Sequence, residues 1–251
     1  MRYLLIITAV LLAIAGCGKK GKLIPPQTFN TAPVNNLKVA QKGDNFQISW
    51  SIPYHNEEGS ALTDLAGFRL FRRTVLPPSE DCETCSDAYQ VVKEVDLDYL
   101  RDARRLGNNL YVTDAGVIAG TTYQYKVITL MKDGTSSEES NKFRLAKITP
   151  IPGPMLKALP TPTSIVLHWE SMTVPATVKE KGYNIYRWRA NDLPALVPLN
   201  SAPLLANDYE DLRLERGVSY VYSVRVVVEA AGASFESVAS NQARAAMSEP
   251  D

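Results

Sequence analysis

Cys82 and Cys85 form a C-x-x-C pair, the spacing in this 251-residue sequence that could support redox, metal or crosslinking chemistry. A local disulfide is expected if the chain is exported, because exported chains are oxidised and neighbouring cysteines then pair. A redox-active pair would need a thiol pKa lowered by positive charge, whereas Asp81 and Glu83 supply negative charge. A metal site would need two further ligands, and the sequence has no second C-x-x-C. We therefore predict a disulfide between Cys82 and Cys85 and keep a thiol-redox role as an alternative.

The two histidines offer little for catalysis. His168 precedes Trp169 in an alternating segment, which predicts a solvated strand residue on the face opposite the tryptophan. His55 lies near Glu57 and Glu58 in a polar segment that is typical of a turn. The motifs G-x-S-x-G and H-E-x-x-H and a phosphate-binding glycine loop do not occur. The sequence therefore predicts a protein that is not an enzyme, with no catalytic residue, no cofactor and no metal site.

The N-terminus has the features of an export signal. Arg2 is followed by the uncharged run Tyr3–Ile14, whose 12 residues are too few for a membrane-spanning helix. The next residues, ending in Ala15-Gly16-Cys17, resemble a bacterial lipobox, in which the cysteine is lipidated and becomes the first mature residue. The resemblance implies a signal peptide over 1–16 and a membrane anchor on Cys17, which is stable when two or more acyl chains are attached.

The segment 17–33 has the composition of a flexible tether, rich in Lys, Pro, Gln, Thr and Asn. Its beginning, CGKKGKLIPP, resembles the attachment region of small outer-membrane lipoproteins, C-G-x-K-G-P-L-x-x-P, with Lys22 in place of the first proline. By resemblance to lipoprotein sorting signals, Gly18 favours the outer membrane. A periplasm-facing and a surface-exposed position both remain open.

The charge balance argues against a nucleic-acid partner. Cleavage after residue 16 removes Arg2 from the 27 basic residues and leaves 26 against 27 acidic ones, a net charge of −1. Because a near-neutral chain has no basic footprint, we expect no nucleic-acid binding.

One pattern occurs twice at an offset of 97 residues, as VTDAGVIAGTTYQYKV at 112–127 and as YEDLRLERGVSYVYSV at 209–224. Each copy follows an alternating segment that ends in tryptophan, at Trp50 and Trp169. Short segments with period-2 alternation and turn residues between them predict an all-β chain built from two sandwiches.

The order of these segments resembles the fibronectin type III domain, with a strand ending in tryptophan, a glycine-led aromatic strand and then L-x-x-G-x-x-Y-x-Y-x-V. The resemblance implies that Trp50 and Trp169 fill the two immunoglobulin-like cores. It also implies that Tyr123 and Tyr220 bond their hydroxyls back to the preceding corner. Val117 stands where the motif usually has leucine.

The resemblance divides the chain into domains. The first fibronectin type III domain is expected over 34–148 and the second over 155–246, followed by a tail at 247–251. Between them, the segment 149–154 reads TPIPGP, and its three prolines restrict bending. We expect a semi-rigid rod.

The first domain carries an insertion. Gly67 and Tyr123 are 56 residues apart, whereas their counterparts Gly182 and Tyr220 are 38 apart, a difference of 18. One inserted stretch, 77–89, contains the cysteine pair. The other, 96–108, has apolar residues at helical spacing before Gly107, which predicts a short amphipathic helix covering an edge of the sandwich. Those apolar residues are Leu97, Leu100, Ala103 and Leu106.

Period-2 alternation also predicts which side chains leave the core of the second domain. Tyr186 and Trp188 face outward on one strand, and Val221 and Val227 face outward on its neighbour. These four residues could form an exposed apolar strip that binds a protein partner, because Tyr and Trp are enriched at such sites. Alternatively, they pack as cross-strand pairs or against the other domain.

Together, the anchor, tether and fold predict a membrane-anchored, non-catalytic protein-binding or scaffolding module of the cell envelope. The expected partners are the membrane, through the lipid on Cys17, and an envelope protein. A carbohydrate-binding lipoprotein that stacks glycan on exposed aromatic rings is the alternative, together with the redox role of the cysteine pair.

Overall fold

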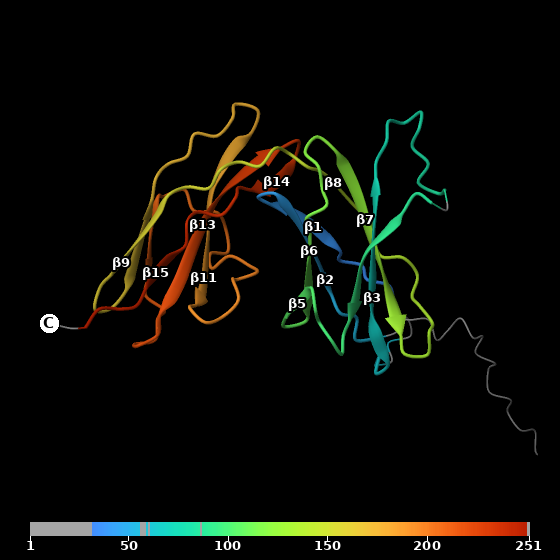
Figure 1. Ribbon diagram of the computed structural model, residues 1–251, viewed down its shortest axis with the longest axis horizontal. Coiled ribbons are helices and arrows are strands. Elements are labelled where there is room, and N and C mark those ends of the chain that lie inside the picture. The colour runs from blue at the N-terminus through green and yellow to red at the C-terminus, as the bar shows by residue number, and fades with distance from the viewer. Residues whose placement is uncertain (1–31, 56–58, 60, 86, 250–251) are drawn as a thin grey trace, which may run out of the picture.

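The computed structural model describes residues 32–55, 59, 61–85 and 87–249, and these residues form strands, turns and loops but no helix (Figure 1). Cys17 and the proposed signal peptide lie outside the described residues, as does the tether up to residue 31. No described segment is a helix long and apolar enough to cross a bilayer.

The N-terminal sandwich consists of two antiparallel sheets. One has the order β1 (Lys38–Lys42), β2 (Asn45–Ser51), β6 (Asn109–Asp114) and β5 (Ala103–Leu106). The other has the order β4 (Gln90–Asp96), β3 (Leu65–Thr74), β7 (Thr122–Met131) and β8 (Phe143–Ala146). The sheets meet through alternate apolar side chains, and the Trp50 ring contacts that of Phe68 edge-on at 5.5 Å between ring centroids.

The C-terminal sandwich repeats this arrangement. Its first sheet has the order β9 (Leu156–Pro160), β10 (Ile165–Trp169) and β12 (Asp208–Asp211). Its second has β11 (Lys179–Arg189) beside β13 (Tyr220–Ala230), which pairs along its length with β15 (Ala243–Ala245) and β14 (Ala233–Glu236). Trp169 lies in this core, 5.5 Å from the Tyr183 ring. The predicted all-β sandwich fold is confirmed.

The corner residues named by the resemblance make the expected hydrogen bonds. The hydroxyl of Tyr123 accepts a hydrogen bond from the amide of Ile118 at 3.1 Å, and that of Tyr220 accepts one from Glu215 at 3.2 Å. Each bond ties the start of a central strand to the loop before it, so the two sandwiches are closed by the same device.

A buried carboxylate precedes each corner and is fully partnered. Asp114 accepts hydrogen bonds from Arg72 at 2.8 Å and from the Tyr125 hydroxyl at 2.8 Å. In the second sandwich, Asp211 accepts the same two bonds from the equivalent arginine and tyrosine, Arg187 and Tyr222. Since these carboxylates have their lone pairs occupied, they are structural groups that hold the sheets together.

The prediction of a short helix over 96–108 is wrong. Residues Ala103–Leu106 form strand β5, which pairs with β6 and ends in a two-residue turn at Gly107 and Asn108. Gly107 has a φ of +59°, the left-handed conformation that a glycine adopts at the first position of a tight hairpin turn. Leu97 and Leu100 still pack on the core, but β5 is the last strand of its sheet, so the segment extends the sheet instead of covering its edge.

One sheet continues through both sandwiches. Strand β1 pairs in parallel with β14, with Gln41 opposite Phe235 and Lys42 opposite Glu236, which gives the path β11-β13-β14-β1-β2-β6-β5. In Figure 1 these two strands lie where the sandwiches meet. The amide of Gly43 adds a backbone bond to the Glu236 carbonyl at 2.9 Å.

The segment between the sandwiches is packed against them. Gln41 is buried, and its side-chain amide exchanges two hydrogen bonds of 3.0 Å with the backbone of Ile148. Ile151 is also buried, and its carbonyl accepts a bond from the amide of Val238 at 2.8 Å. At Gly153 a Cβ atom would lie 2.5 Å from the Ala239 carbonyl oxygen, so only glycine fits this close approach.

Candidate interaction surface at the junction

The strip predicted from strand alternation is not exposed. Tyr186 has 3%, Val221 7% and Val227 3% of its surface accessible. Trp188 is half-buried. The alternation assigned these side chains to the correct face of the sheet, but other parts of the chain cover that face. The prediction of an exposed apolar strip is therefore wrong.

A charged network covers Tyr186 at the junction. Lys42, from the N-terminal sandwich, donates hydrogen bonds to the Tyr186 hydroxyl at 2.9 Å and to the Leu196 carbonyl at 2.8 Å. The Tyr186 hydroxyl in turn donates to the carboxylate of Glu236 at 2.7 Å. A charge from one sandwich is thus held by groups of the other.

The carboxylate of Glu236 serves two cations, Arg225 and, through the Tyr186 hydroxyl, Lys42. The guanidinium of Arg225 lies 3.8 Å from it, and the amide of Asn184 donates to it at 2.7 Å. Burial lowers the pKa of the Lys42 ammonium despite the opposing attraction of Glu236. Burial, with Glu236 adjacent, raises the pKa of the Tyr186 hydroxyl, which stays protonated and donates. The network has one more positive than negative charge.

A cavity of about 330 Å³ opens beside this network, between the two sandwiches. Its N-terminal wall includes Lys42, Gln47 and Arg104, and its C-terminal wall includes Trp188 and Leu196. Arg104 also crosses from β5 to donate a hydrogen bond to the Pro194 carbonyl at 2.5 Å. The structure therefore brings Trp188 to a cavity that neither sandwich forms alone.

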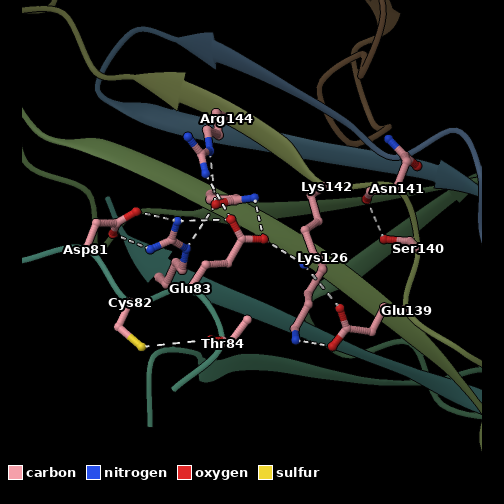
Figure 2. Close-up of polar contacts among 12 residues, drawn as sticks. Asp81, Cys82, Glu83, Thr84, Lys126, Glu139, Ser140, Asn141, Lys142 and Arg144 are labelled. Atoms are coloured by element: carbon pink, nitrogen blue, oxygen red, sulfur yellow. Dashed lines mark hydrogen bonds and ion pairs between the residues drawn. The ribbon is translucent and has the colours of Figure 1, made fainter. Parts of the chain in front are cut away.

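The insertion with the cysteine pair folds over the outer face of the other N-terminal sheet. Cys82 and Cys85 form a disulfide, with their Cα atoms 5.5 Å apart, and both residues are exposed. Figure 2 shows the neighbouring acidic side chains turned toward basic groups of the sheet. Asp81 accepts from Arg73 at 2.5 Å, and the side chain of Arg73 is only 2% exposed.

Glu83 binds two further basic side chains, one just before strand β8 and one within it. Its carboxylate accepts hydrogen bonds from Lys142 at 2.6 Å and from Arg144 at 2.9 Å (Figure 2). The bond to Lys142 lowers the pKa of Glu83, and the bond to Arg73 lowers that of Asp81. The disulfide loop is therefore fastened to the sheet by ion pairs on both sides of Cys82. The negative charges of Asp81 and Glu83 beside the cysteines are therefore neutralised by basic side chains of this sheet.

The remaining candidates lie apart from both regions. His168 is exposed on β10 opposite the buried Trp169, as predicted. His55 is exposed too, whereas Glu57 and Glu58 lie outside the described residues. Among the side chains that the structure describes, no group of three or more His, Cys, Asp or Glu could hold a metal ion.

These features define a chain of two all-β sandwiches joined by a shared sheet. No protein-family model matches the sequence, and no curated protein matches it. Among solved structures, the chain is similar to the FN1-FN3 domains of chicken CNTN1, with 14% sequence identity and a TM-score of 0.35. The match covers 87% of this chain and 68% of that one.

Proposed function

We propose that this chain is a membrane-anchored, non-catalytic scaffold that holds two β-sandwiches in one fixed arrangement for a protein partner in the cell envelope. The observation that carries the proposal is the parallel pairing of β1 with β14, which runs one sheet through both sandwiches. A chain that only needed to space two independent domains would not require paired strands across the junction. Fixed geometry is the property that a scaffold supplies to its partner.

The junction is stabilised by several kinds of contact. Two residues of β1 supplement the backbone pairing: the side-chain amide of Gln41 bonds the backbone of Ile148, next to the linker, and the ammonium of Lys42 bonds Tyr186 of the opposite sandwich. The linker itself is buried at Ile151. Because these contacts must break together for the sandwiches to turn relative to each other, the arrangement is stiff.

Membrane anchoring is the second part of the proposal, and the sequence supports it. Cys17 follows a signal-like apolar run, and residues 17–33 have the composition of a tether. Two or more acyl chains on Cys17 would hold the protein stably at a membrane. Gly18 after the cysteine favours the outer membrane as the location.

The test measures anchoring and rigidity separately. Wild-type protein and a Cys17→Ser variant are compared by membrane fractionation and by incorporation of a palmitate analogue. The wild type should be labelled and sediment with membranes, and the variant should do neither. Equal behaviour of both proteins would refute the anchor.

Rigidity is measured with spin labels at Glu138→Cys and Leu212→Cys, exposed positions in the two sandwiches. One narrow distance distribution is expected. A Lys42→Glu variant, which places a second carboxylate at the junction, should broaden it, whereas Lys38→Glu on the exposed face of β1 should not. A broad distribution in the wild type would overturn the scaffold proposal.

A further inference from the structure

The cavity at the junction has an unusual charge. Among the residues that the structure describes around it, three side chains are cationic, those of Lys42, Arg104 and Arg225, and none is acidic. Glu236 neutralises one of these charges from behind the cavity wall. The whole chain has equal numbers of acidic and basic residues, so this local excess of positive charge is a property of the site.

Two of the cations have hydrogen-bonding capacity beyond their structural contacts. The Lys42 ammonium has three N–H groups and two acceptors among the described residues, the Tyr186 hydroxyl and the Leu196 carbonyl. Arg104 has five N–H groups, of which the Pro194 carbonyl takes one. An anion in the cavity would therefore meet N–H donors from two strands of the N-terminal sandwich, β1 and β5.

The cavity also offers apolar surface. Trp188 lines it and also lines the neighbouring hollow of about 770 Å³ around Arg187 and Arg213. The rim is aliphatic where one loop forms it, since Pro194, Ala195 and Leu196 line the cavity. Aliphatic side chains on a rim suit the side chains of a peptide, whereas sugar rings stack on flat aromatic faces.

We infer that the junction cavity binds an acidic peptide segment of a protein partner, with carboxylates on Arg104 and Lys42 and an apolar side chain against Trp188. The inference rests on the proposed function, because the fixed junction creates the cavity. The charge complementarity selects an anion, and the aliphatic rim selects a peptide over an acidic saccharide. The volume of about 330 Å³ suits two or three side chains.

The first experiment measures the sign of the charge around Trp188 by collisional quenching of its fluorescence. Trp50 and Trp169 are each 1% exposed, so collisional quenching in solution reports Trp188. Iodide should quench its fluorescence more strongly than caesium, because the surrounding cations attract anions. Arg104→Glu should reverse this order. Arg105→Glu, its exposed neighbour on β5, changes the net charge equally and should leave the order unchanged. Equal quenching by both ions in the wild type would overturn the inference.

The second experiment measures binding of fluorescein-labelled acetyl-Glu-Phe-Glu-Leu-Glu-amide to the mature chain. Replacing its three glutamates by glutamine should weaken binding at least tenfold, as expected for the loss of charge-assisted hydrogen bonds. Arg104→Glu should weaken it by a similar factor, and Arg105→Glu should not. Since Arg104 also braces the junction, Trp188→Leu provides an independent variant, and it should weaken binding at least fivefold.

Competing anions decide the source of the ligand. Trigalacturonate and inorganic phosphate are titrated against the bound peptide. Displacement by either at lower concentration than the unlabelled peptide would overturn the peptide assignment. Absence of peptide binding with a narrow spin-label distance would overturn this inference and leave the scaffold standing, whereas a broad distance would overturn the scaffold itself.

Discussion

The junction network predicts that Glu236→Gln is strongly destabilising although the substitution is nearly isosteric. The side chain of Glu236 is 12% exposed and provides the carboxylate in contact with Arg225. It also accepts hydrogen bonds from Tyr186 and Asn184. The neutral amide leaves Lys42 and Arg225 close together without a counter-charge.

The magnitude follows from the distances. A pair of unit charges 3.8 Å apart attracts by about 4 kcal/mol at an effective dielectric constant of about 20. Removing one member of a buried pair costs about 3 to 5 kcal/mol because the other charge stays buried. Partial exposure of Arg225 favours the low end, so we expect a loss of about 3 kcal/mol in the free energy of unfolding. For a chain of this size that corresponds to a Tm lower by about 9 °C.

The network also predicts that Lys42→Met rescues the first substitution. Alone, Lys42→Met removes one of two cations that share a carboxylate, and burial already disfavours the charge of that ammonium. Its cost should stay below about 1 kcal/mol. In the Glu236→Gln background it removes the uncompensated repulsion and should restore about 1.5 kcal/mol, a coupling typical of residues in one network.

The assay is chemical denaturation of the two single variants, the double variant and Glu229→Gln. Glu229 supplies a matched control, because its ion pair with Lys181 is solvent-exposed and should contribute at most about 1 kcal/mol. Additive effects of Lys42→Met and Glu236→Gln would refute the shared-charge argument. Equal losses in Glu236→Gln and Glu229→Gln would refute the burial argument.

Three further results are expected. The double variant Cys82→Ser/Cys85→Ser should unfold with a free energy lower by no more than about 2 kcal/mol, because so short a loop gains little from crosslinking, and hydrogen exchange should rise in the loop alone. The carboxyls of Asp81 and Glu83 have depressed pKa values in the folded state, so their contribution is present above about pH 4 and is lost as the pH falls through the folded values; hydrogen exchange between pH 6 and pH 2 should show this loop opening first, and uniform opening of the chain would contradict the assignment. Tyr220→Phe should lower the free energy of unfolding by about 1 to 2 kcal/mol, measured by urea denaturation, because a backbone amide loses its acceptor; an unchanged midpoint would show that water replaces the hydroxyl.

The sandwich cores were predictable from sequence because their determinants are local. The resemblance to the fibronectin type III domain implied that Trp50 and Trp169 fill the cores, and both are 1% exposed. The repeated tyrosines marked the same corner in both halves, and both hydroxyls make the corner bond. These features depend on residues close together in the chain, so one sequence carries enough information to identify them.

The error at residues 96–108 has a specific physical origin. Apolar residues at Leu97, Leu100, Ala103 and Leu106 match a helix, but they also match a turn followed by a strand. Gly107-Asn108 between two polar-apolar segments is the sequence signal of a two-residue hairpin. The hairpin satisfies the backbone groups of β5 through β6, whereas an isolated helix of this length is marginal in water.

The junction could not be predicted for a different reason. Alternation gives the face of a sheet on which Tyr186 lies, but not the element that covers this face. The covering group is Lys42, which is 144 residues from Tyr186 and 154 residues from its second partner, Leu196, along the chain. Their contact depends on the parallel pairing of β1 with β14, which joins strands of different sandwiches and has no local sequence signal. An aromatic residue that alternation places outside a sandwich is therefore as consistent with a domain junction as with a free binding surface, and in this chain the junction turns Trp188 into one wall of a cationic cavity.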